Sequence, residues 1–410
     1  MKYNMTKALG IGVLAGAAAF NADAQSNDAL IKALVKKGML TEAEAASLRN
    51  DAANTDADAM AAWVESLSLK GDLRLRYDHT HDSPSNGASA EDRWRYRFRF
   101  GGTANMQNGV KAGFRLASGG SGSSDDIGST NETFSDGFAR DSISLDQAWA
   151  QMEFSGVTMI GGKNPNWDKT GWFLSKALFD GDITPEGFEA HYTIDGGSVE
   201  YGIHGGAYFI EGEDDGSSSV NNLFIGQLTA KSSLSDTTGL TAGLAAYTVD
   251  DGGLTQAGGG KRKGNSSGVG YSPVMLDLAL SIKKGPGIKL YGTWVDNQEA
   301  DTNENGYLGG IKFGSAKAAG QWEAKYEYRV LEKDAVWDDL VDSDFGAFGV
   351  SAADTYKSGT NVKGSVIQGK YNIYDNVQAA LTFMITEADE GAGGENEDNT
   401  RIQADLIFKF

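Results

Sequence analysis

The feature that most constrains the fold is a two-residue alternation of apolar and polar side chains. Residues 91–100 read EDRWRYRFRF, in which arginines and aromatic residues take turns. Successive side chains leave a strand on opposite faces, so this stretch has one cationic and one aromatic face. Similar runs recur from residue 67 to residue 410. Each is roughly ten residues long, the length of a tilted strand that crosses a bilayer.

The connections between these runs alternate in length. Short turns are expected near residues 105–109, 155–156, 195–197, 235–238, 284–287, 314–320 and 374–376. Long polar segments lie near 78–92, 118–141, 165–184, 211–219, 250–268, 297–305, 331–359 and 388–398. A soluble sandwich has no reason for this alternation, whereas an outer-membrane barrel has short turns at one end and long loops at the other. The sequence therefore predicts an all-β fold, a transmembrane antiparallel β-barrel of about 16 strands, over residues 67–410.

Three segments precede the predicted barrel. Residues 1–24 contain Lys2 and Lys7, a short apolar run and an Ala-Asp-Ala motif, which is typical of a secretory signal peptide. Residues 25–50 have apolar positions at helical spacing and a Thr41/Glu44 capping box, so they predict a periplasmic helical hairpin. A weakly ordered spacer is the alternative. Residues 51–66 are expected to be a linker.

Composition excludes several classes of function. The chain has no cysteine and a formal net charge of -20, which excludes thiolate chemistry and a basic nucleic-acid footprint. The four histidines are scattered, and the acidic runs lack the ligand spacing of a calcium loop. No nucleophile is placed beside a histidine, as a barrel hydrolase would require. The sequence thus predicts no catalytic residue, no metal site and no cofactor.

The arginines of the alternating runs define a predicted pore wall. A charge on the lipid face of a barrel costs roughly 2–4 kcal/mol near the midplane, so these side chains are expected to face the lumen. A barrel of this size is too wide for side chains to fill, which leaves an aqueous channel. The predicted pore-lining residues are Arg74, Arg76, Arg93, Arg95, Arg97, Arg99 and Arg115.

The third long loop is the predicted constriction. It contains Trp167, Trp172, Phe173, Leu174 and Phe179, too much apolar surface for a free external loop. We expect it to fold into the lumen, where its aspartates face the arginine wall, although these aspartates also fit a simple turn-capping role. The predicted constriction residues are Lys163, Asp168, Asp180, Asp182 and Glu186.

Other acidic runs are expected to be solvated external loops that make the pore slightly cation-selective. They are EGEDDG from Glu211, DAVWDDLVDSD from Asp334 and ADEGAGGENED from Ala388.

The same loop carries the most specific motifs. Residues 161–167 read GGKNPNW and residues 178–188 read LFDGDITPEGF. Here the chain resembles a bacterial putative porin family, in which a strand ending in Gly-Lys-x-x-Pro precedes an Asp-x-Asp-x-Thr-Pro-Glu-Gly signature. Asn166 stands where the family pattern has an aromatic residue. The matching residues are Gly162, Lys163 and Pro165, then Asp180, Asp182, Thr184, Pro185, Glu186 and Gly187.

The resemblance covers essentially the whole mature chain, including the N-terminal GMLTEAEA turn. It implies an outer-membrane porin for passive diffusion of small hydrophilic solutes, and by analogy a homotrimer in contact with lipid and lipopolysaccharide. The terminal strand ending at Phe410 is expected to be recognised by the barrel assembly machinery. The alternative function is a barrel-anchored adhesin or envelope-tethering protein, because the hairpin and the acidic loops suit binding to partners.

Overall fold

A computed structural model describes residues 35, 41–46, 63–83, 89–119, 129–134, 137, 140–211, 221–250, 265–266, 268–346, 359–389 and 398–410. The chain divides into two compact units, residues 1–66 with 105–107, and residues 67–104 with 108–410. The predicted signal peptide and most of the predicted hairpin and linker lie outside the described residues. In the first unit, the backbone N–H of Thr41 donates to Glu44 Oε2 (2.8 Å) and that of Glu44 donates to Thr41 Oγ1 (3.2 Å). These are the reciprocal bonds of the predicted capping box.

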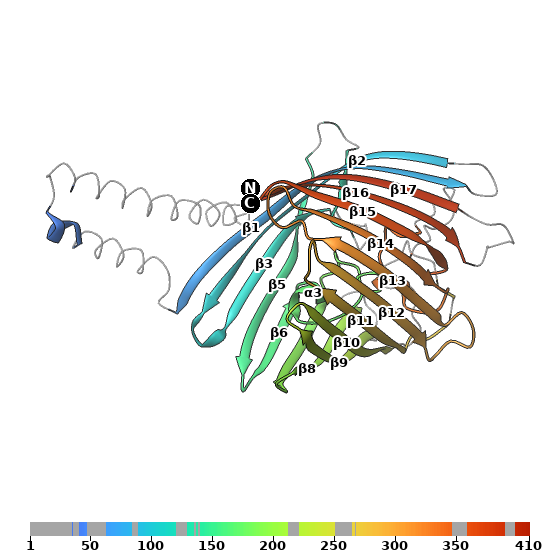
Figure 1. The fold of residues 1–410 in the computed structure, drawn as a ribbon, viewed down its shortest axis with the longest axis horizontal. Coiled ribbons are helices and arrows are strands. Elements are labelled where there is room, and N and C mark those ends of the chain that lie inside the picture. Colours follow the sequence, from blue (N-terminus) through green and yellow to red (C-terminus); the bar gives the residue numbers. More distant parts are fainter. Residues whose placement is uncertain are drawn as a thin grey trace, which may run out of the picture. The chain divides into compact units, whose positions relative to one another are not determined.

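The second unit contains a closed antiparallel β-barrel of sixteen strands (Figure 1), which confirms the predicted fold class. The first eight are β1 (Val64–Ser83), β2 (Ser89–Met106), β3 (Lys111–Ser118), β5 (Ile143–Phe154), β6 (Val157–Lys163), β7 (Glu186–Asp195), β8 (Val199–Glu211) and β9 (Asn221–Ser235). The others are β10 (Thr238–Asp250), β11 (Pro273–Ile282), β12 (Ile288–Asn297), β13 (Asn305–Gly314), β14 (Trp322–Leu331), β15 (Val362–Tyr374), β16 (Val377–Ala388) and β17 (Asp398–Lys409). A two-residue strand, β4 (Glu132–Thr133), pairs with β2. Among the described residues no helix is long and apolar enough to span a membrane.

Connections alternate between short and long around the barrel, as the sequence predicts. Ser155 and Gly156 alone join β5 to β6, with φ of 51° and 81°, a left-handed backbone whose twist matches that of the two strands. The third long loop, residues 164–185 (hereafter L3), lies between β6 and β7 and holds the helix α3 (Trp167–Thr170). The seventh joins β14 to β15, and its residues 332–346 are called L7 below.

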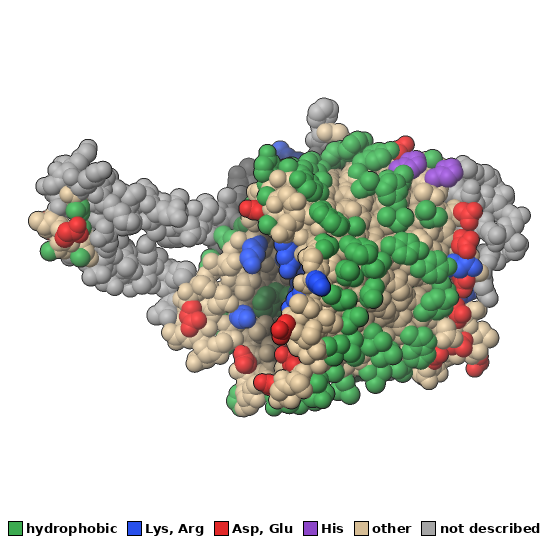
Figure 2. All heavy atoms as spheres, viewed as in Figure 1, with side chains coloured by type: hydrophobic (Ala, Val, Ile, Leu, Met, Phe, Trp, Pro, Cys, Tyr) green, Lys and Arg blue, Asp and Glu red, His purple; other side chains and the backbone are tan. Residues whose placement is uncertain are grey.

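The two faces of the strands differ as the alternation predicts. On β2 the side chain of Trp94 is 60% exposed, whereas Arg99 is buried. On β14 Trp322 and Tyr326 are exposed, and Arg329 is buried. Figure 2 shows hydrophobic side chains covering the outer face turned to the viewer, and Lys and Arg side chains gathered in the hollow beside it. The aromatic face is therefore the outer face of the barrel.

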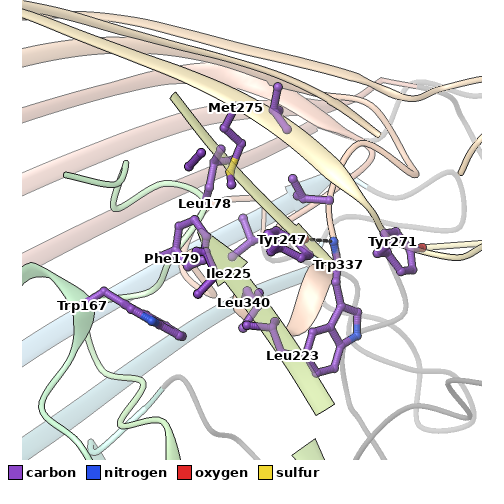
Figure 3. Packing of buried hydrophobic residues seen from close by; sticks show 14 of the residues in the cluster. Trp167, Leu178, Phe179, Leu223, Ile225, Tyr247, Tyr271, Met275, Trp337 and Leu340 are labelled. Atoms are coloured by element: carbon purple, nitrogen blue, oxygen red, sulfur yellow. Dashed lines mark hydrogen bonds between the residues drawn. The ribbon is translucent and has the colours of Figure 1, made fainter. Parts of the chain in front are cut away.

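Part of the barrel interior is an apolar core rather than water. L3 and L7 both turn inward and pack against β8 to β12 (Figure 3). Trp167 and Phe179 of L3 and Trp337 of L7 belong to one cluster, and the backbone N–H of Trp337 donates to the Tyr247 hydroxyl (2.9 Å). The cluster also includes Trp172, Leu178, Ile183, Tyr208, Leu223, Ile225, Ala245, Val249, Tyr271, Met275, Val295, Leu331, Ala335, Val336, Leu340 and Val341.

The prediction of a solvated loop over the DAVWDDLVDSD run is wrong. Asp334 and Asp338 are both 4% exposed, because the apolar residues between the aspartates draw the segment into the core. The carboxylates accept from the backbone N–H groups of Ser266 (2.7 Å) and Asn265 (3.2 Å), which offsets the cost of burying them. The runs beginning at Glu211 and Ala388 lie largely outside the described residues.

The seam that closes the barrel gives a first prediction. Gly71 and Phe410 exchange backbone hydrogen bonds of 2.7 and 3.0 Å, and the Phe410 ring stacks 6.4 Å from that of Phe98. Deleting Phe410 should lower the yield of the folded, heat-modifiable barrel, because each lost bond contributes about 1 kcal/mol in addition to the ring contact. Phe410→Ala, which keeps the backbone bonds, should have a smaller effect. Phe154→Ala, which removes an aromatic ring that is 67% exposed, is the control and should leave the yield unchanged. An equal yield after deletion would contradict the importance of this seam.

Candidate functional site: the lumen beside L3

The seven predicted arginines lie on three strands, and all but Arg74 contact a carboxylate. On β2 Arg97 contacts Asp72 (2.7 Å), and Arg93 and Arg95 approach Asp78 (2.9 and 3.8 Å). The other four bind partners that come from different strands or from loops. Arg74 binds Asn131, Arg76 binds Asp405 (2.7 Å), Arg99 binds Asp182 (2.8 Å), and Arg115 binds Asp146.

An eighth arginine belongs to this wall although the sequence prediction omits it. Arg401 on β17 is 2% exposed and contacts Asp78 (2.7 Å) and Asp344 (2.9 Å). The alternation along the last strand already indicates that Arg401 faces inward. Its position beside the wall follows only from the pairing of β17 with β1, in which Arg401 stands opposite Thr80.

Two cavities lie along the wall. The larger, about 770 Å³, is lined by Arg74 and Arg76, by parts of L3 and L7, and by β11 to β17. The second, about 610 Å³, is lined by Arg97, Arg99 and Arg115 together with the terminal residues of β17. Arg93 and Arg95 line neither of these two cavities. The wall therefore has a part that meets open space and a part that is packed.

Asn166 ties the two ends of L3 together. Its side-chain oxygen accepts from the backbone N–H of Asp168 (3.2 Å) and so caps α3. Its amide nitrogen donates to the carbonyl oxygens of Asp180 (2.6 Å) and Ile183 (3.0 Å). Asn166, which departs from the family pattern, thus holds the two ends of L3 together. The aromatic role falls to Trp167, whose indole N–H donates to the Tyr208 hydroxyl (3.0 Å).

Asp182 is the L3 carboxylate that reaches the arginine wall. It lies 2.8 Å from Arg99 and 3.9 Å from Arg97. Burial acts to raise the pKa of Asp182, but Arg99, Arg97 and Arg74 outweigh burial and lower it to about 2. This carboxylate is therefore ionised over the whole physiological range.

Asp180 and Asp168 do not pair with the wall, contrary to the expectation for all three aspartates. Asp180 accepts from the backbone N–H of Ser343 in L7 (3.1 Å), and burial, with Asp342 and Asp182 close by, raises its pKa to about 8. Asp168 binds Lys169 (2.8 Å) and Lys176 (2.6 Å). The geometry differs from the expectation because L3 packs against L7 and does not lie alone in the lumen.

The other two predicted constriction residues lie at strand ends. Lys163 and Glu186 are register partners on β6 and β7 and form an ion pair of 2.9 Å. The Glu186 side chain is 62% exposed, so this is a solvent-accessible pair and a weak one.

L7 supplies acidic residues that the sequence analysis missed. Asp344 contacts Arg401 (2.9 Å) and Arg76 (3.2 Å), and Asp342 contacts Arg329 (2.7 Å). Burial opposes ionisation of Asp344, but Arg401 and Arg76 outweigh it and hold its pKa well below the usual range. The available signal was the apolar Val-Trp…Leu-Val pattern between the aspartates, which is the same signal that identified L3.

Comparison with known proteins identifies the family. The model of a family described as "Putative porin" matches residues 83–252 and 277–410, more than half of the chain. The chain belongs to this family. No curated protein matches the chain at a significant level.

A solved porin structure shares the fold. The chain matches a structure of Pseudomonas putida OprB with a TM-score of 0.56 and 8% identity, covering 88% of this chain and 97% of that one. It also matches a substituted Rhodopseudomonas blastica porin with a TM-score of 0.45 and 14% identity, covering 84% of this chain and all of that one. Family and fold favour a porin channel of the bacterial outer membrane over an enzyme. In the described part of the chain, no group of three or more His, Asp or Glu side chains is arranged to hold a metal ion.

The contact between L3 and L7 gives a pH prediction. The ordinary pKa of an aspartate is 3.8, and that of Asp180 is raised to about 8 in the folded protein. The contribution of Asp180 to the stability of the contact between L3 and L7 is therefore fully present below pH 3.8 and is lost as the pH rises through about 8. Hydrogen exchange of L3 and L7 amides, corrected for the intrinsic rate, should therefore quicken as the pH rises from about 4 to about 8 and should level off above pH 8. Asp180→Asn should abolish this change because the amide does not titrate. A change that persists in Asp180→Asn would show that another group is responsible.

The parity of β2 gives a second prediction. Arg97→Glu places a carboxylate on the inner face at a position that lines the cavity of about 610 Å³, so the barrel should insert and become less permeable to anions. The difference should fade at high salt, since screening acts over about 8–10 Å at ordinary ionic strength. Tyr96→Glu/Phe98→Glu puts charge on the lipid face, at roughly 2–4 kcal/mol for each residue near the midplane, and should impair insertion. Reversal potentials measure the change in ion permeability, and the folded yield measures insertion. If the inner-face variant failed to insert and the lipid-face variant changed permeability instead, the assignment of the two faces of β2 would be wrong.

Proposed function

We propose that this protein is an outer-membrane channel for passive diffusion of small hydrophilic solutes and ions, narrowed where L3 meets the arginine wall. The observation that carries the proposal is the position of Asp182, 2.8 Å from Arg99 and beside the cavity of about 770 Å³. Because Asp182 and Arg99 are in direct contact, the pair closes the gap between L3 and the wall, and solutes pass beside it through the cavity of about 770 Å³. The apolar core holds L3 in this position.

In this proposal the predicted site residues have different roles. Arg97 and Arg99 face Asp182 at the constriction, and Arg74 and Arg76 line the space beside it. The remaining predicted residues keep the wall and L3 in place. They are Arg93, Arg95 and Arg115 on the wall, and Lys163, Asp168, Asp180 and Glu186 around L3.

The proposal includes a setting for the channel. The N-terminal unit lies in the periplasm after removal of the signal peptide, and the long loops contact lipopolysaccharide on the outer side. Three copies assemble into a homotrimer, and the C-terminal strand is the element that the assembly machinery recognises. Cross-linking of native outer membranes tests the trimer directly.

The proposal is tested by removing a side chain that holds L3 in place. Trp167 is 2% exposed and packs edge-on against Phe179 with a centroid distance of 5.1 Å, so Trp167→Ala removes about 3–5 kcal/mol of packing. L3 should then leave the wall, and single-channel conductance in planar bilayers should rise and fluctuate. The control is Trp294→Ala, which removes an outward side chain that is 44% exposed and should leave conductance unchanged. A wild-type barrel without open steps would instead favour the anchoring function. A conductance unaffected by Trp167→Ala would remove L3 from the proposal.

A further inference from the structure

A row of lysines crosses three neighbouring strands on the lumen side. Lys289 on β12 stands directly opposite Lys312 on β13, and Lys312 stands opposite Lys325 on β14. All three line the cavity of about 770 Å³, as does Lys370 on β15. Residues directly opposite each other in an antiparallel pair have Cβ atoms about 4.5–5.5 Å apart, and like charges at such positions are destabilising. The fold therefore retains an arrangement that is unfavourable when the lumen holds only water.

The carboxylates of this region do not neutralise the row. Glu323 is shared between Lys312 (3.2 Å) and Lys370 (3.3 Å). Glu327 lies 3.7 Å from Lys325 but is held by a closer contact with Arg329 (2.5 Å).

Lys289 is the least compensated member of the row. Among the described residues no ion pair involves it, and its ammonium group lies 5.8 Å from the centroid of the Tyr291 ring. The row thus keeps a local excess of positive charge within a cavity whose lining has eight acidic and eight basic side chains in all.

The second cavity also has cations in its lining. A single acidic side chain, that of Asp72, lies among them. Its six cationic residues are Lys70, Arg97, Arg99, Arg115, Lys169 and Lys409. Four of the six are ion-paired with aspartates, and Lys70 and Lys409 are the two for which the described residues show no ion pair.

We propose that Lys289, Lys312 and Lys325 form a binding subsite for small oxyanions, solutes that carry carboxylate or phosphate oxygens. This inference rests on the proposed channel function and names the solute class of its lumen. An oxyanion between the ammonium groups removes their mutual repulsion and replaces their water with charge-assisted hydrogen bonds. A cavity of about 770 Å³ accommodates small organic acids and phosphate esters. The preference is opposite in sign to the slight cation selectivity that the acidic composition predicts.

The test uses the purified full-length protein in planar bilayers. Inorganic phosphate or succinate is added to a potassium chloride solution, and the reduction of single-channel current gives an apparent Kd for each probe. Lys289→Gln/Lys312→Gln should raise that Kd about fivefold for each lysine removed, the size expected for contact between unit charges in water. Folding should be retained, because the substitutions remove repulsion and leave neutral side chains that suit a wet lumen.

Lys283→Gln/Lys284→Gln is the matched control. It removes two positive charges from the exposed short turn between β11 and β12, outside the lining of either cavity. The two probes should block this variant as strongly as they block the wild type. The subsite is supported if either probe blocks the wild type and the control variant but blocks Lys289→Gln/Lys312→Gln less. The probe with the lower apparent Kd identifies phosphate or carboxylate as the preferred group.

Three outcomes count against these ideas in different ways. Open channels that neither probe blocks would overturn the oxyanion subsite and leave the channel function intact. An equal loss of block in the control variant would also overturn it, by showing an effect of overall charge. The absence of any conductance would overturn the proposed channel itself.

Discussion

The structure depends on the requirement that every backbone polar group in a bilayer finds a partner within the protein. A strand meets this requirement only when both of its edges are paired, so the sheet must close on itself. Closure is completed where β1 pairs with β17 in a register that runs from Asp72–Lys409 to Ser83–Asp398. The C-terminal residue extends the seam, since a Cβ at Gly71 would overlap the Phe410 ring. The absence of a side chain at residue 71 thus lets the last aromatic ring cover the join.

Closure also creates the electrostatics of the lumen. It brings Arg401 of β17 beside Asp78 and Arg76 of β1, residues more than three hundred positions apart in the chain. These groups are almost fully buried and are linked through Asp344 of L7. A buried ion pair gains little over an apolar pair, but removal of one partner costs about 3–5 kcal/mol because the other charge is left uncompensated. The network therefore fixes the position of L7 more than it adds to overall stability.

The apolar core inside the barrel sets where a solute can pass. L3 and L7 bury tryptophan, phenylalanine and leucine side chains against β8 to β12, and this side of the lumen is packed. The open space lies toward β12 to β17 and the arginine strands, so its lining is strongly charged. Because L3 and L7 pack on one side of the lumen, only the charged side remains open. The inward loops define the path, and the strands supply its charge.

The sequence by itself determined the elements that depend on local periodicity. Period-two alternation identified the strands and their faces, turn residues located the short connections, and apolar content predicted an inward fold for L3. Each of these signals is local, because side-chain direction and turn geometry are set within a few residues. Tertiary structure alone decided which charges meet. The pairing of Arg401 with Asp78, the inward fold of L7 and the alignment of Lys289 with Lys312 follow from strand register and closure. Those contacts join residues distant in sequence, and the energies that select them belong to the closed barrel and to no single segment of the chain.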